Sequence, residues 1–135
     1  MVRIGAARML AVLAGFGSLL MAADRVLARG ACEAKTMATV DRKVPDGGLS
    51  ASIRSGPAPL EVTFAARGGG EVYFGGGWLD FGDGERTMVC RPGSGCRETS
   101  ATHTYSQAGT YCALLIGEGE GERLLLGSVT INVGH

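Results

Sequence analysis

The sequence lacks the features expected of an enzyme or of a nucleic-acid-binding protein. Its thirteen basic and thirteen acidic residues cancel, so no overall field attracts nucleic acid or an anionic membrane surface. Histidine occurs only twice, and no serine stands in a Gly-x-Ser-x-Gly motif. The chain therefore offers no candidate pair of nucleophile and base for covalent catalysis, and we expect a protein that is not an enzyme.

Proline is also scarce, whereas glycine is abundant. The chain of 135 residues has four prolines and 23 glycines. This balance is typical of many turns between short strands and disfavours long helices beyond the N-terminal segment. The length suits one domain with a tail.

Long apolar runs are missing except near the N-terminus. Arg3 and Arg8 precede residues 9–23, which carry no charge. This order of a charged and then an apolar region is typical of a secretory signal peptide. The run is shorter than the ~20 residues of a typical membrane-spanning helix. We predict a signal peptide over residues 1–28.

Cleavage is predicted after Ala28, with Ala23 as the second choice, because small or modest side chains stand at the positions that signal peptidase reads. An uncleaved anchor ranks below cleavage. A lipid anchor on Cys32 is rejected, because Arg29 occupies a position where an aliphatic residue is expected. Removal of the signal takes away three arginines and one aspartate, which leaves ten basic and twelve acidic residues. The mature protein is predicted to be secreted or periplasmic, with no membrane span.

The four cysteines are an even number in a chain predicted to be exported, which favours disulfides over free thiols. Cys90 and Cys96 flank a turn and are candidates to close a hairpin, and Cys32 and Cys112 are the other candidates. All three possible pairings stay open at this point. A zinc site is disfavoured, because no histidine lies near Cys90 and Cys96 in the sequence.

The chain after the signal divides into an arm and a domain. Residues 29–48 mix charged with small side chains and end in a turn-rich boundary, so we predict a linker. In residues 49–135, short runs of alternating apolar and polar residues are separated by turns. The strongest run places Leu60, Val62 and Phe64 on one face, toward a core. About seven such strands predict an all-β antiparallel sandwich.

The most constrained stretch of the chain is Trp78–Gly84. Leu79 and Phe81 alternate with Asp80, and Gly82-Asp83-Gly84 follows. Aspartate accepts hydrogen bonds from backbone N–H groups nearby, and glycine adopts positive φ without steric cost. We interpret Asp80 and Asp83 as structural corner residues. The alternatives are calcium ligands or a general acid and base.

His103 and Tyr105 precede a turn and a strand. We predict that they pin the corner before that strand, as a tyrosine corner does in β-sandwiches. The alternating glycines and glutamates of residues 117–122 predict a soluble hairpin tip rather than a metal cage. We expect no catalytic residue, no metal and no cofactor, with calcium as a lesser alternative.

Taken in order, these landmarks resemble the polycystic-kidney-disease (PKD) domain. The matching segments are residues 56–64, Asp80-Phe81-Gly82-Asp83-Gly84, His103-Thr104-Tyr105, Gly109-Thr110-Tyr111 and residues 129–133. The resemblance covers about residues 49–135 and implies an immunoglobulin-like β-sandwich. It also implies an extracellular interaction or spacer module, commonly found beside catalytic domains that act on polysaccharide or protein. The family does not require cysteines, so their pairing is peculiar to this chain.

One departure from the family pattern concerns Trp78. The family places tryptophan immediately before the first aspartate, where this chain has Leu79, and a shift of one residue moves a side chain to the opposite face of a sheet. We favour Leu79 in the core and Trp78 outside it. The alternative is a bulge near Gly75–Gly77 that returns Trp78 to the core.

These observations predict a secreted or periplasmic non-catalytic module that binds a protein or glycan surface. Tyr73 and Trp78 are the candidate binding residues, because flat aromatic side chains cover sugar rings and anchor interfaces; a core position for both is the alternative. Two other functions stay open, a structural or adaptor protein of the cell envelope without a small ligand and a calcium-stabilised module. The partner would be an extracellular or envelope protein or polysaccharide.

Overall fold

The computed structural model describes residues 32, 36, 38–69 and 72–135. The predicted signal peptide lies outside the described residues, as do the first residues of the predicted linker. In the described part of the chain, no helix is both long and apolar enough to cross a membrane. The strands are β1 (Arg42–Lys43), β2 (Gly48–Ala51), β3 (Ser55–Pro57), β4 (Leu60–Arg67), β5 (Val72–Tyr73), β6 (Gly76–Asp80), β7 (Arg86–Cys90), β8 (Ser94–Gly95), β9 (Thr99–Tyr105), β10 (Gly109–Glu118) and β11 (Arg123–Gly134).

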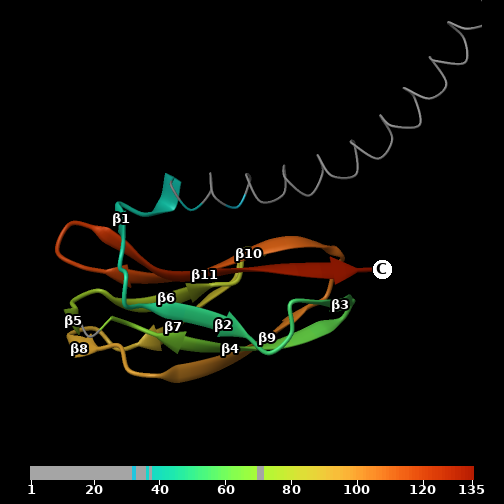
Figure 1. The fold of residues 1–135 in the computed structure, drawn as a ribbon, viewed down its shortest axis with the longest axis horizontal. Helices are drawn as coiled ribbons and strands as arrows, with labels where there is room; N and C mark the ends of the chain where they lie inside the picture. The colour runs from blue at the N-terminus through green and yellow to red at the C-terminus, as the bar shows by residue number, and fades with distance from the viewer. Residues whose placement is uncertain (1–31, 33–35, 37, 70–71) are drawn as a thin grey trace, which may run out of the picture. The chain divides into compact units, whose positions relative to one another are not determined.

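The longer strands form two sheets that pack face to face as a sandwich (Figure 1). Sheet A has the strand order β1-β11-β10-β6-β7, with β3 also paired to β11, and sheet B has the order β2-β4-β9. Strands β5 and β8 form a separate small sheet. The predicted all-β sandwich is therefore confirmed. Its long strands pair antiparallel, whereas β1 and β3 run parallel to β11.

The structure has more strands than the seven or so predicted. The additional ones, β1, β3, β5 and β8, contain only two or three residues each. Such short segments pair with a neighbour but carry no detectable alternation of their own. Strand β2 begins at Gly48, one residue before the predicted start of the domain, and the proline-containing segment after it forms β3.

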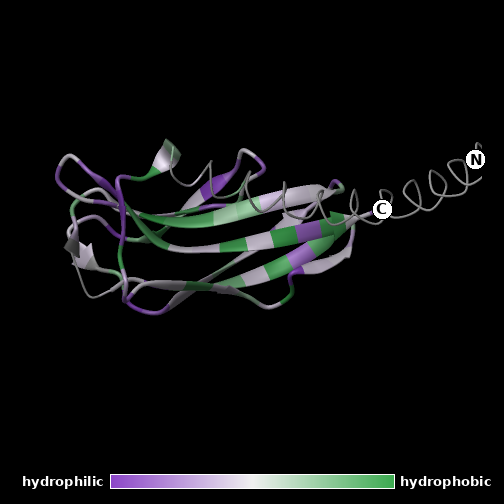
Figure 2. Ribbon diagram, turned by 45° about the horizontal axis from the view of Figure 1, so that its top comes forward, coloured by the Kyte–Doolittle hydropathy of each residue, from purple (hydrophilic) through white to green (hydrophobic). Residues whose placement is uncertain are grey.

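Strand β4 shows how local alternation builds the core. Its residues alternate strictly between buried and exposed. Figure 2 shows the corresponding bands of hydrophobic residues along the strands. As predicted, Leu60, Val62 and Phe64 face one core together. They meet Leu79 of β6 and Ile131 of β11 from the opposite sheet, and neither of these two is exposed to solvent.

Strand β10 departs from alternation. Ala113 and Leu115 point into the sandwich, but Leu114 and Ile116 are also buried. They form a small apolar cluster with Leu125 on the outer face of sheet A, and Val40 packs against it. The segment before β1 thus covers part of this face.

The second half of the predicted linker lies within the sandwich. Arg42 and Lys43 form β1 and pair with β11, and the N–H of Val44 donates to the carbonyl of Leu125 at 2.8 Å. The Val44 side chain is 3% exposed and belongs to the core. Residues 41–48 are consequently part of the folded unit and do not act as a free tether.

Candidate functional site

The corner after β6 is held by its own carboxylates. Oδ1 of Asp80 accepts the N–H of Gly82 at 2.8 Å, and Oδ1 of Asp83 accepts the N–H of Glu85 at 3.1 Å. Gly82 has a φ of 85°, and a Cβ there would lie 2.6 Å from the carbonyl oxygen of Cys112. Both the positive φ and the close approach to β10 require glycine. These hydrogen bonds to backbone N–H groups are the ones expected if Asp80 and Asp83 are structural corner residues.

His103 closes the same corner from the other sheet. Its Nε2 lies 2.6 Å from Oδ2 of Asp83, and its Nδ1 lies 3.6 Å from Oε2 of Glu85. The ring stacks on Phe81, with 3.9 Å between centroids and 4° between planes. The imidazole thus stacks on an aromatic ring with one face and contacts two acidic side chains through its nitrogens, and only 9% of the side chain is exposed.

Asp83, Glu85 and His103 have donor atoms within 4.8 Å of one another, the spacing of a potential metal site. However, the two carboxylates contact opposite nitrogens of the imidazole ring, so they do not converge on one point beside a single nitrogen. Calcium requires six to eight oxygen ligands, and this group supplies two carboxylates. The arrangement is an imidazole held between two carboxylates.

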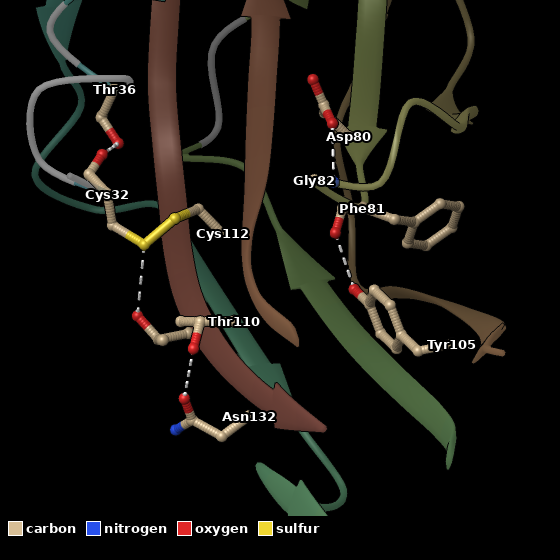
Figure 3. Close-up of a disulfide and its surroundings, with 10 residues drawn as sticks. Cys32, Thr36, Asp80, Phe81, Gly82, Tyr105, Thr110, Cys112 and Asn132 are labelled. Carbon is tan, nitrogen blue, oxygen red and sulfur yellow. Dashed lines mark hydrogen bonds between the residues drawn. A yellow bond between two sulfur atoms is a disulfide. The ribbon is translucent and has the colours of Figure 1, made fainter. Parts of the chain in front are cut away.

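Tyr105 links the two sheets at the same end of the sandwich. Its hydroxyl donates to the carbonyl of Phe81 at 2.8 Å, in a buried contact between the end of β9 and the residue after β6 (Figure 3). Burial, with a further contribution from the negative charge of Asp83, raises the pKa of the Tyr105 phenol above its usual value. Tyr105 therefore acts as a neutral hydrogen-bond donor between the sheets.

The bond typical of a tyrosine corner falls on a different residue. The hydroxyl of Tyr111 donates to the carbonyl of Gln107, four residues upstream, at 2.7 Å, which is the local bond that defines such a corner. Tyr105 and Tyr111 stack with centroids 4.6 Å apart. The predicted corner of His103 and Tyr105 did not include Tyr111, although its place near the start of a strand was a usable signal.

The prediction that Tyr73 is a binding residue is wrong. Tyr73 has no exposed surface and belongs to a second core cluster with Leu115 and Leu126. Space for its ring comes from Gly117 of β10, where a Cβ would lie 2.6 Å from the ring. The pairing of a buried tyrosine with a glycine on a different strand cannot be inferred from either local sequence.

Trp78 lies outside the core, as favoured. Leu79 is fully buried, while Trp78 occupies the outer face of sheet A and is half-buried. A register shift occurs between Gly77 and Trp78 in the pairing of β6 with β7. An irregularity of the kind considered in the alternative is therefore present, but it does not return Trp78 to the core.

Around Trp78 lies a surface that we call the Trp78 patch, consisting of Phe74, Trp78, Arg86 and Met88. Met88 is directly opposite Trp78 on β7 and is 41% exposed. The guanidinium of Arg86 lies 4.3 Å from the centroid of the Trp78 ring. The indole N–H donates to the carbonyl of Gly75 at 3.3 Å, which places the ring beside the turn that carries Phe74, 62% exposed.

Comparison with known proteins gives one informative match. No family model matches the sequence, and no curated protein matches it. Among solved structures, the PKD domain of an M14-like peptidase from Thermoplasmatales archaeon SCGC AB-540-F20 aligns with a TM-score of 0.52 and 14% identity, over 66% of this chain and 96% of that domain. The chain has the fold of a PKD domain.

The four cysteines of this PKD-like chain form two disulfides. Cys90 pairs with Cys96 across the turn after β7, and Cys32 pairs with Cys112 of β10, with Cα atoms 5.1 and 5.6 Å apart. Cys112 stands on the outer face of sheet A, where Figure 3 shows its bond to Cys32. Thr130 of the neighbouring strand donates to the Cys32 sulfur at 3.9 Å. The first disulfide belongs to the core, and the second fixes the N-terminal arm to the outer face of sheet A.

Proposed function

We propose that this PKD-like chain is a non-catalytic interaction module, exported to the periplasm or the cell exterior, that binds a protein or glycan surface through the Trp78 patch. The observation that carries the proposal is the patch itself. It combines an aromatic ring, an exposed methionine and a guanidinium on the outer face of sheet A with an exposed phenylalanine in the turn before β6. Aromatic residues, methionine and arginine are the side chains enriched in binding interfaces.

The ionisable residues of the corner support a non-catalytic role. Asp80 and Asp83 accept backbone hydrogen bonds, and both ring nitrogens of His103 face carboxylates. All cysteines are paired in disulfides, so no thiol is available as a nucleophile. Oxidised cysteines also suit the predicted oxidising compartment.

A structural or adaptor role in the cell envelope remains the second candidate function. It would use the same exposed patch to contact another protein without recognising a small ligand. A calcium-stabilised module is the third, and it has less support, because the corner carboxylates already serve the fold.

The proposal is tested by pull-down from a native envelope fraction and by binding to immobilised polysaccharides. Trp78→Ala should reduce capture of the partner at least about tenfold, as expected for an interface residue that contributes ~2 kcal/mol. Thr102→Ala, on the outer face of sheet B, is the matched control and should leave capture unchanged. Equal capture by wild type and Trp78→Ala, with both folded by circular dichroism, would exclude the patch as the binding site.

A further inference from the structure

Strand β7 forms the edge of sheet A beside the Trp78 patch. It pairs with β6 on one side. Within the described residues, no strand pairs with its other side, and β9, which lies nearby, belongs to sheet B. An unpaired edge presents backbone N–H and C=O groups to which an extended segment can add as a further strand.

The side chains of β7 give this edge a distinct chemistry. Arg86 and Met88 are exposed, whereas Thr87 and Val89 are half-buried. Arg86 and Met88 therefore line the outer face next to any strand that pairs with β7, and they stand two positions apart, the spacing of one strand face. A neighbouring strand would place one residue opposite Arg86 and, two positions away, another residue opposite Met88.

The charged side chain that β7 exposes is Arg86. It is in register with Asp80 of β6, and Glu85 precedes it in the sequence. In the described part of the chain Arg86 nevertheless forms no ion pair with a carboxylate; its guanidinium lies over the Trp78 ring. A guanidinium without an ion-pair partner complements an acidic side chain.

We propose that the β7 edge binds an extended segment of a partner protein by strand addition, and that this segment carries an acidic residue opposite Arg86 and an apolar residue opposite Met88. The proposal rests on the proposed function, since it specifies how a protein partner engages the Trp78 patch. The apolar side chain would extend the surface of Met88 and Trp78, and the acidic one would pair with Arg86.

A peptide fits these observations better than an acidic polysaccharide. A polysaccharide would use the guanidinium and the indole, but it has no backbone amides to match the edge of β7. Strand β9, an edge of sheet B, provides an internal comparison: its exposed residues Ser100, Thr102 and Thr104 are small and uncharged. Of these two edge strands, β7 is the one that combines arginine and methionine with a neighbouring tryptophan.

A synthetic peptide of palindromic sequence, acetyl-Thr-Glu-Thr-Leu-Thr-Glu-Thr-amide, serves as the probe. With leucine opposite Met88, it offers glutamate opposite Arg86 in either strand direction. The peptide is titrated into the isotopically labelled, disulfide-bonded protein and followed by NMR. We expect saturable shifts of the amides of β7 and of the Trp78 indole. Saturable shifts confined to β9 or to the other end of the sandwich would overturn the proposal.

Backbone methylation of the peptide separates strand addition from side-chain binding. Successive residues of a strand direct their N–H groups to opposite edges. One analogue is N-methylated at the central leucine and a second at the following threonine, so only one of them loses ladder hydrogen bonds to β7. We expect one analogue to bind at least about tenfold more weakly than the other. Equal dissociation constants for the two analogues would overturn strand addition.

A charge exchange tests the assignment of Arg86. Arg86→Glu should lower the affinity of the protein for the glutamate peptide about five- to tenfold. It should raise the affinity for a peptide with lysine in place of glutamate, as expected for a cross-strand charge pair. Arg86→Gln should lower the affinity for the glutamate peptide only. Arg67→Glu, an exposed charge reversal on β4 of sheet B, is the control and should change neither. Unchanged discrimination between the two peptides in Arg86→Glu would overturn the proposal.

The outcomes also separate this proposal from the proposed function. If polygalacturonate binds in a Trp78-dependent manner and the peptide does not, strand addition fails while the patch remains the binding site. If Trp78→Ala leaves envelope capture intact, the proposed function fails, whatever the peptide does.

Discussion

The outer faces of the two sheets differ in how many apolar side chains they carry and in what covers them. On sheet A, the cross-strand register aligns Leu125, Ile116, Trp78 and Met88 in one apolar row. On sheet B, Thr63 lies opposite Thr102, their hydroxyls 3.1 Å apart and exposed. An antiparallel sheet normally packs one face on the core and leaves the other in water. Sheet B follows this rule, whereas sheet A carries an apolar row on its outer face as well as an apolar inner face.

The two ends of the apolar row on sheet A differ in how far they are covered. One end of the apolar row is covered by the chain itself, through Val40 and the arm that Cys32 fixes to Cys112. The other end, at Trp78 and Met88, is only partly covered. Sheet A therefore carries an intramolecular contact at one end and an available surface at the other, and sheet B carries neither.

Removal of the arm's disulfide should have the largest effect on this comparison. The bond joins residues 80 apart in the sequence, and the chain-entropy model assigns about 4.5 kcal/mol to a loop of that length. The variant Cys32→Ser/Cys112→Ser should lose stability of this order in urea unfolding. The bond between Cys90 and Cys96 closes a separation of six residues, and its removal should cost less, about 2 kcal/mol on the same basis. The reverse order would contradict the assignment of the arm.

The buried outer face of sheet A should be far more sensitive to truncation than the outer face of sheet B. Leu114 is 1% exposed, so Leu114→Ala should lower the free energy of unfolding by about 2–5 kcal/mol. Thr102→Ala, exposed on sheet B, should change it by no more than about 0.5 kcal/mol. Similar losses in the two variants would mean that the arm does not cover Leu114 in solution.

The link between the sheets is tested by Tyr105→Phe. This change removes the hydroxyl and leaves the carbonyl of Phe81 without its donor in a buried site. We expect a loss of about 1–3 kcal/mol in chemical unfolding. Tyr111→Phe is the control, because its bond to Gln107 is exposed and local, and it should cost less. A larger loss for Tyr111→Phe would show that the tyrosine corner, and not the link between sheets, dominates this end.

The same tyrosine predicts a smaller, pH-dependent effect. The pKa of Tyr105 is raised in the folded protein by burial, so the unfolded chain releases the phenol proton at lower pH than the folded chain. This contribution to stability is complete below the unfolded pKa of ~10 and declines as pH rises above it. Urea midpoints between pH 9 and 11 should fall more steeply for wild type than for Tyr105→Phe. Parallel profiles would contradict the burial of this phenol.

Much of the fold was predictable from local patterns. The alternation of β4 placed Leu60, Val62 and Phe64 correctly in the core, because spacing by two along a strand fixes which side chains share a face. The corner was predictable for a similar reason: aspartate and glycine act on their own backbone within two residues. The resemblance to the PKD pattern is matched by the fold of a solved PKD domain.

The candidate site was only half predictable. Trp78 was placed on the outer face by alternation through Leu79, but its partners, Arg86 and Met88, depend on a register that contains a bulge. Tyr73 was assigned to the surface because nothing near it in sequence indicates a glycine on β10. Its burial follows from Gly117, which is distant in sequence and adjacent in space.

What the amino-acid order fixes in this protein is the set of long strands, the inward face of β4 and the aspartate-glycine corner, because each depends on backbone geometry within a few residues. The folded arrangement alone decides that Leu114 and Ile116 are covered, that Tyr73 is internal and that Cys32 joins Cys112. Burial and pairing are set by whichever segment packs against a residue, and in a sandwich that segment comes from another strand.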